Sequence, residues 1–126
     1  MKILLVDDDH SSGSSLTQAF TEENYVVNLV TDGETALKIA RSCSYDLIVL
    51  NLISSHRKSL KICQILRNEG YQGSIMMLSR QDQANAVIEC DHSLDAGADV
   101  CVPNSADVQK VMTQMHHLLD QRSSHD

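Results

Sequence analysis

Short apolar runs alternate along this chain with longer segments whose apolar residues recur at helical spacing. Examples of the short runs are ILLV at 3–6 and LIVL at 47–50. A short, continuous apolar run is typical of a strand that is buried on both faces of a parallel sheet. The pattern predicts strands over residues 2–6, 25–30, 46–51, 74–78 and 99–103.

After each predicted strand, apolar residues fall three and four positions apart, which is the spacing of one helix face. Following the last strand, for example, Val108, Val111 and Met115 share a face. Gly70 and Gly97 are placed to end two of the helices, because glycine readily adopts the backbone conformation that follows a helix. The predicted helices cover residues 11–23, 31–43, 57–69, 82–95 and 105–120.

Regular alternation of strand and helix predicts an α/β fold with a parallel sheet. Right-handed crossovers between successive strands then leave a doubly wound sheet with helices on both faces, in three α/β/α layers. We expect one domain over residues 1–121. Residues 122–126 carry no apolar anchor and are expected to form a disordered tail or the start of a linker.

Composition narrows the function classes. The net charge of −7 over 126 residues argues against nucleic acid as a partner, because phosphate binding requires a basic surface. The chain shows neither a membrane-spanning apolar stretch nor a signal peptide, which predicts a cytoplasmic protein without membrane contact. The cysteines are scattered without a CxxC pair, which predicts reduced thiols and no zinc site. They are Cys43, Cys63, Cys90 and Cys101.

Polar residues gather where the predicted strands end, and open α/β sheets bind ligands at that edge. Asp7, Asp8 and Asp9 follow the first strand. Clustered carboxylates favour a hard cation such as Mg²⁺. The alternative interpretation is that they cap the next helix, which suits Asp9 best because it lies nearest the helix start. The other polar residues at this edge are Asn51, Ser79 and Asn104.

Five segments carry a resemblance to a known family: ILLVDDD at 3–9, TDGETAL at 31–37, YDLIVLNL at 45–52, MMLS at 76–79 and AGAD at 96–99. Together they resemble the receiver domain of two-component response regulators, over residues 2 to about 120. They occur in the family's order and at nearly its spacing. The resemblance implies a flavodoxin-like (βα)5 fold with strand order 2-1-3-4-5, and a bacterial signalling module rather than an enzyme.

Receivers accept a phosphoryl group from a histidine kinase onto an aspartate, beside Mg²⁺ that is held by this aspartate and an acidic pair. The resemblance places the acidic pair on Asp7 and Asp8, and the Thr/Ser switch position on Ser79. It places the phosphoacceptor on Asn51 and the family's lysine on Asn104, which are two departures.

A third departure is Cys101, which occupies the aromatic switch position of strand five. Phosphoryl transfer to a receiver needs a carboxylate oxygen, and the carboxamide of Asn51 is a poor nucleophile that adds no charge to a metal site. With Asn104 also neutral, the site keeps two carboxylates and no cation. A single engineered change at Asn51 would not explain the departures at Asn104 and Cys101.

We therefore expect a pseudo-receiver, an interaction module that works independently of aspartyl phosphorylation, with no catalytic residue and no cofactor beyond weak Mg²⁺ at Asp7 and Asp8. Two alternatives stay open: a phosphorylatable receiver with a nonstandard acceptor, and a small-molecule or anion sensor that uses the vacated crevice. The resemblance implies a protein partner (a histidine kinase, an output domain or another signalling protein) at the helix four–strand five–helix five face. A homodimer through that face is also open.

Overall fold

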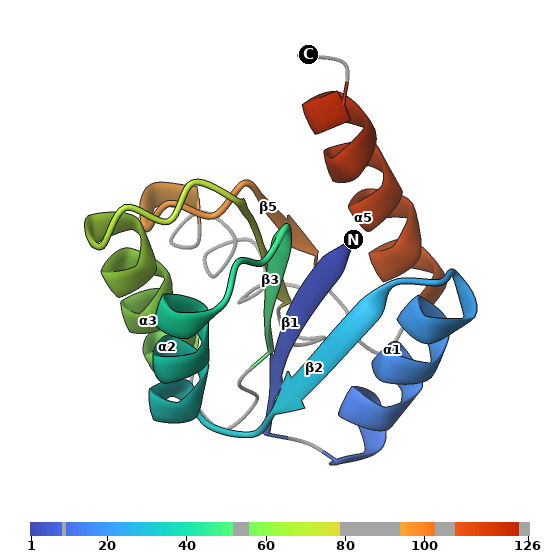
Figure 1. Ribbon diagram of the computed structural model, residues 1–126, viewed down its shortest axis with the longest axis horizontal. Helices are drawn as coiled ribbons and strands as arrows, with labels where there is room; N and C mark the ends of the chain where they lie inside the picture. The colour runs from blue at the N-terminus through green and yellow to red at the C-terminus, as the bar shows by residue number, and fades with distance from the viewer. Residues whose placement is uncertain (9, 52–55, 79–93, 103–107, 124–126) are drawn as a thin grey trace, which may run out of the picture.

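The computed structural model describes residues 1–8, 10–51, 56–78, 94–102 and 108–123. These residues form a parallel five-stranded sheet in the order β2-β1-β3-β4-β5 (Figure 1). The predicted doubly wound α/β fold is confirmed, and each strand lies within two residues of its predicted bounds. The strands are β1 Lys2–Asp7, β2 Val26–Val30, β3 Leu47–Asn51, β4 Ser74–Leu78 and β5 Val100–Val102.

The helices cover both faces of this sheet, as Figure 1 shows: α2 and α3 lie on one face, and α1 and α5 lie on the other. The helix predicted over 82–95 falls largely outside the described residues. α5 continues past residue 120, where the sequence predicted its end. The helices are α1 His10–Glu22, α2 Gly33–Ser42, α3 His56–Asn68 and α5 Val108–Ser123.

Two separate cores form because alternate residues of each strand point to opposite faces. Leu4 and Val6 of β1 face α2 and α3, while Ile3 and Leu5 face α1 and α5. The side chains of all four are fully buried. The same holds for the apolar residues of β3, so the continuous apolar runs in the sequence reflect strands covered on both sides.

The start of α2 is fixed by its cap. The carboxylate of Asp32 accepts hydrogen bonds from the backbone N–H of Thr35 at 2.8 Å and from its hydroxyl at 3.0 Å. These bonds, together with one from the N–H of Glu34, lower the pKa of Asp32. Gly33 follows directly and lies against Ile62 of α3 so closely that a Cβ there would overlap that side chain. The first turn of α2 is therefore packed directly onto α3.

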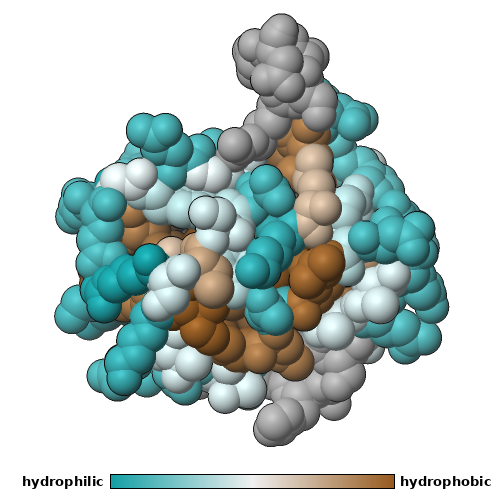
Figure 2. Space-filling model, viewed as in Figure 1, coloured by the Kyte–Doolittle hydropathy of each residue, from teal (hydrophilic) through white to brown (hydrophobic). Residues whose placement is uncertain are grey.

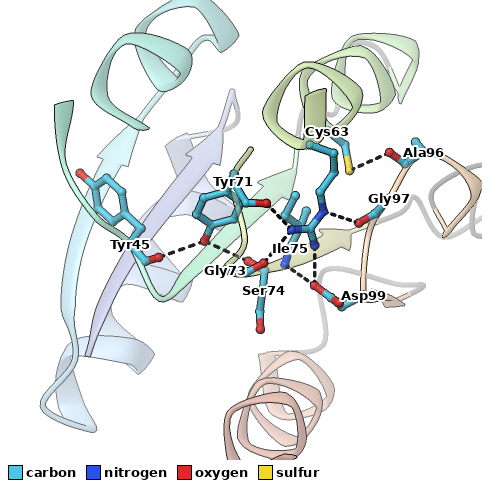
Figure 3. A network of polar contacts seen from close by, with 10 residues as sticks. Tyr45, Cys63, Tyr71, Gly73, Ser74, Ile75, Ala96, Gly97 and Asp99 are labelled. Carbon is cyan, nitrogen blue, oxygen red and sulfur yellow. Dashed lines mark hydrogen bonds and ion pairs between the residues drawn. The ribbon is translucent and has the colours of Figure 1, made fainter. Parts of the chain in front are cut away.

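Near the starts of β4 and β5, Arg67 of α3 binds the segments that precede both strands. Its partners are labelled in Figure 3. Its guanidinium donates to the carbonyl oxygens of Tyr71, Gly73 and Gly97, each at 2.9 Å. It also pairs with Asp99 at 2.9 Å, and the Asp99 carboxylate accepts the backbone N–H of Ile75 at 2.8 Å. One side chain thus ties the end of α3 to the entries of β4 and β5.

The cysteines only partly follow the sequence prediction. Cys43 and Cys63 are free, but Cys101 is disulfide-bonded, so the prediction of reduced thiols was wrong at that residue. Spacing along the chain could not show this, because disulfide formation depends on Cα atoms lying within about 7 Å in space.

Within the described ranges, no helix is both long and apolar enough to cross a membrane.

Candidate functional site

The site is built where β1 and β3 end side by side. Their parallel register pairs Asp7, the last residue of β1, with Asn51, the last residue of β3. Both side chains are almost completely buried, with exposed fractions of 1% and 2%. The sequence predicted that these two residues share the carboxyl edge of the sheet, and this is confirmed.

The two side chains bind each other directly. Nδ2 of Asn51 donates a hydrogen bond of 2.9 Å to Oδ2 of Asp7. The amide N–H group thus supplies a neutral hydrogen-bond donor to the buried side chain of Asp7. Asp8 is the next residue in the sequence. Its side chain is partly exposed and also takes part in polar or electrostatic interactions.

These residues can be tested against the magnesium site that the resemblance implies. Mg²⁺ prefers oxygen ligands in octahedral geometry and keeps several of its waters. Asp7 and Asp8 supply suitable carboxylates, but Asn51 turns its nitrogen toward Asp7, and one oxygen of Asp7 is occupied by that contact. Among the described residues, no group of three or more His, Cys, Asp or Glu side chains is placed to hold a metal ion. Among the described residues at the carboxyl ends of β1 and β3, the carboxylates that could hold a cation are therefore those of Asp7 and Asp8.

The remaining site residues from the sequence cannot all be placed beside this pair. Asp9, Ser79 and Asn104 lie outside the described residues. Cys101 lies in β5, is half-buried, and packs against the core that α2 and α3 cover. Of the site residues predicted from the sequence, the structure thus brings Asp7 and Asn51 into direct contact.

A groove that the sequence did not predict lies between the first turns of α2 and α3. It has a volume of about 730 Å³ and an apolar floor that includes Leu37, Ile62 and Ile65. Asp32 and Glu34 of α2, and Lys58 and Lys61 of α3, also line it. The only sequence signal for it is the charged residues that flank the apolar positions at the start of each helix.

Comparison of the sequence with known protein families identifies the family of this chain. The family model for the response regulator receiver domain matches residues 3–116. The chain belongs to the response regulator receiver family. Receivers are modules of two-component signalling rather than classical enzymes, and the flavodoxin-like fold described above is theirs.

Curated relatives agree with the family assignment. Protein RcaC of Microchaete diplosiphon is 34% identical over 124 residues, which cover 98% of this chain and 19% of that protein. Response regulator MprA of Mycolicibacterium vanbaalenii is 32% identical over 126 residues, which cover 100% of this chain and 53% of that protein. The chain therefore spans about half or less of the length of these relatives.

Solved receiver structures share the fold. A CheY-like receiver domain from Methanospirillum hungatei superposes with a TM-score of 0.85 at 18% identity, covering 99% of this chain and 98% of that one. The response regulator TrrA of Thermotoga maritima, solved in complex with Mg²⁺ and BeF, gives a TM-score of 0.75 at 24% identity, covering 93% of this chain and 97% of TrrA. TrrA has also been solved in complex with the histidine kinase ThkA.

Proposed function

We propose that this receiver is a pseudo-receiver, a signalling module that recognises its partner without being phosphorylated on an aspartate. The observation that carries the proposal is the buried hydrogen bond from Asn51 to Asp7 at the family's acceptor position. An aspartate at position 51 would place a second carboxylate against Asp7, and a cation would have to separate them. The amide removes that requirement.

The chemistry of the pair supports the same conclusion. Phosphoryl transfer needs a nucleophilic oxygen in line with the donor, and an amide whose nitrogen already donates to a carboxylate offers none. Among the described residues at the carboxyl ends of β1 and β3, those that carry a nucleophilic side-chain oxygen are therefore Asp7 and Asp8. The side chain of Asp7 is 1% exposed and already accepts a hydrogen bond, which makes its attack on a phosphodonor unfavourable.

Magnesium binding in this proposal is weak and serves no reaction. Two carboxylates at Asp7 and Asp8 attract a divalent cation, but the third anionic ligand that the family provides is replaced by Asn51. TrrA, which shares this fold, was solved with Mg²⁺ and BeF, and in this proposal the present chain does not carry out the corresponding chemistry. The same receiver fold remains available to a protein partner.

The partner in this proposal is a histidine kinase, an output domain or another signalling protein in the cytoplasm. Support comes from TrrA, which was solved together with the kinase ThkA, and from relatives that are longer than this chain. We place the contact on the face formed by helix four, β5 and α5. Asn51 then keeps the receiver in one state, which the partner recognises directly.

Incubation with acetyl phosphate and Mg²⁺, followed by intact-mass measurement, tests the proposal. The wild-type chain is expected to gain no phosphoryl adduct. The matched control is the double variant Asn51→Asp with Asn104→Lys, which restores both departures and is expected to gain one adduct that requires Mg²⁺. A Mg²⁺-dependent adduct on the wild-type chain would overturn the proposal, and peptide mapping would then identify the nonstandard acceptor.

A further inference from the structure

The β2 strand forms one edge of the sheet and has β1 as its neighbour on one side only. This edge is unusually apolar at the surface: the exposed fractions are 57% for Val26 and 38% for Leu29, and Met1 beside the strand is 53% exposed. On the face where Figure 1 places β2, Figure 2 shows apolar patches with hydrophilic residues between them. The edge thus offers both backbone groups and apolar side chains to a partner.

The direction of the backbone groups follows from the pairing with β1. The N–H of Val26 donates to the carbonyl oxygen of Met1 at 2.9 Å, so the polar backbone groups of Val26 face β1. Because these groups alternate along a strand, those of Asn28 also face β1. The N–H and C=O groups of Val27 and Leu29 therefore point outward, away from the sheet.

This edge lacks the features by which proteins usually prevent strand addition. Native edge strands commonly carry lysine, proline or an inward-pointing charge, which blocks pairing with another chain. The segment Val26–Val30 reads VVNLV and contains neither a charged residue nor a proline. The polar side chain of Asn28 is directed to the α2 and α3 face, where its Oδ1 accepts a hydrogen bond from the hydroxyl of Tyr45 at 2.8 Å.

We propose that the β2 edge binds the β2 edge of a second copy of this chain, as an antiparallel pair centred on Asn28. The segment is nearly palindromic, so this arrangement places Val26 opposite Val30 and Val27 opposite Leu29 of the other copy. The outward groups of Val27 and Leu29 then exchange hydrogen bonds across the interface. The two sheets join into one continuous sheet.

A second copy suits this edge better than an unrelated strand, because a two-fold interface requires a self-complementary surface. The near-palindrome provides this, and no like charges face each other within the paired segment, although the chain carries a net charge of −7. A single strand pair is a small interface, so the dimer is weak, with a dissociation constant between roughly 10 μM and 1 mM. This proposal is independent of the chemistry at Asn51.

Sedimentation and NMR on the full chain test the proposal together. Sedimentation velocity over this concentration range is expected to show reversible dimerisation. In parallel, the amides of Val27 and Leu29 are expected to become protected from hydrogen exchange as concentration rises, whereas those of Val26 and Asn28 stay protected throughout by β1. A dimer formed through any other surface would leave the Val27 and Leu29 amides exchanging freely, and that result would overturn the proposal.

Two matched variants separate edge pairing from a general loss of structure. Leu29→Pro removes an outward N–H that β1 does not use, so the fold is retained while dimerisation weakens at least tenfold. Leu29→Thr keeps that N–H on a strand-forming residue and weakens dimerisation much less. Circular dichroism checks that both variants are folded. The proposal would also be overturned if the wild-type chain stayed monomeric at 1 mM, which is about the weakest affinity expected. It would be overturned as well if the two folded variants self-associated equally.

Discussion

Asn51 and Asp7 are paired residues on neighbouring strands, and their side chains join through a 2.9 Å hydrogen bond in a fully buried environment. The parallel register of β1 and β3 places the two residues opposite each other, at the last position of each strand. It satisfies a buried carboxylate with a neutral amide where the family places an aspartate and a metal ion. The stability of the domain is therefore tied to the position at which we propose that the family's phosphochemistry is lost.

Replacing Asn51 with aspartate is expected to destabilise the domain when no divalent cation is present. The new carboxylate loses the hydrogen bond to Asp7 and repels its charge, which costs roughly 1–3 kcal/mol of unfolding free energy. Added Mg²⁺ should recover most of this loss, since the site then has three carboxylates. Urea unfolding with and without Mg²⁺ measures both effects, and a variant that is as stable as wild type in EDTA would contradict the prediction.

The sequence was sufficient to predict the fold and the meeting of Asp7 with Asn51. Strands buried on both faces give continuous apolar runs, and residues that end parallel strands must gather at one edge. The hydrogen bond itself could not be predicted. It depends on the exact register of β1 against β3, which places Asn51 opposite Asp7, and on the orientation of the Asn51 amide. The family resemblance supplied the role of each position but none of its contacts.

The contacts of Arg67 and the groove between α2 and α3 were missed for a common physical reason. Each depends on segments that are distant in the sequence and meet only after folding. Arg67 looks like an ordinary basic residue near a helix end, yet three of its four partners are backbone carbonyls, which leave no mark on side-chain patterns. Such contacts become visible only when the backbone is traced in space.

Removing the guanidinium by Arg67→Met is expected to lower the unfolding free energy by roughly 2–4 kcal/mol, because part-buried carbonyls lose a charged donor. The variant also leaves Asp99 without its ion-pair partner. Arg67→Lys keeps the charge but cannot reach several acceptors at once, so an intermediate loss is expected. Chemical denaturation of both variants provides the comparison. Equal stability of the lysine variant and wild type would mean that the charge, and not the fork of donors, matters.

Gly33→Ala is expected to destabilise the contact between α2 and α3 by up to roughly 1 kcal/mol, although alanine normally favours a helix. The added Cβ meets Cδ1 of Ile62, which is the end of that side chain. Ile62→Val removes this methyl group and should recover part of the loss in the double variant. A double-mutant cycle by thermal unfolding measures the coupling, and strictly additive effects would show that the two residues do not clash.

Cys63 makes the stability of the domain fall at alkaline pH. Burial raises the pKa of this thiol from 9.0 to about 11, and its Sγ donates to the carbonyl oxygen of Ala96 at 3.6 Å. Because the unfolded thiol loses its proton near pH 9 and the folded one near pH 11, its contribution is complete below pH 9 and declines between those values. Urea titrations across this range should show the decline. In the Cys63→Ala variant, the unfolding free energy should fall less steeply with pH over this range. If it falls as steeply as in the wild-type chain, groups other than Cys63 cause the decline.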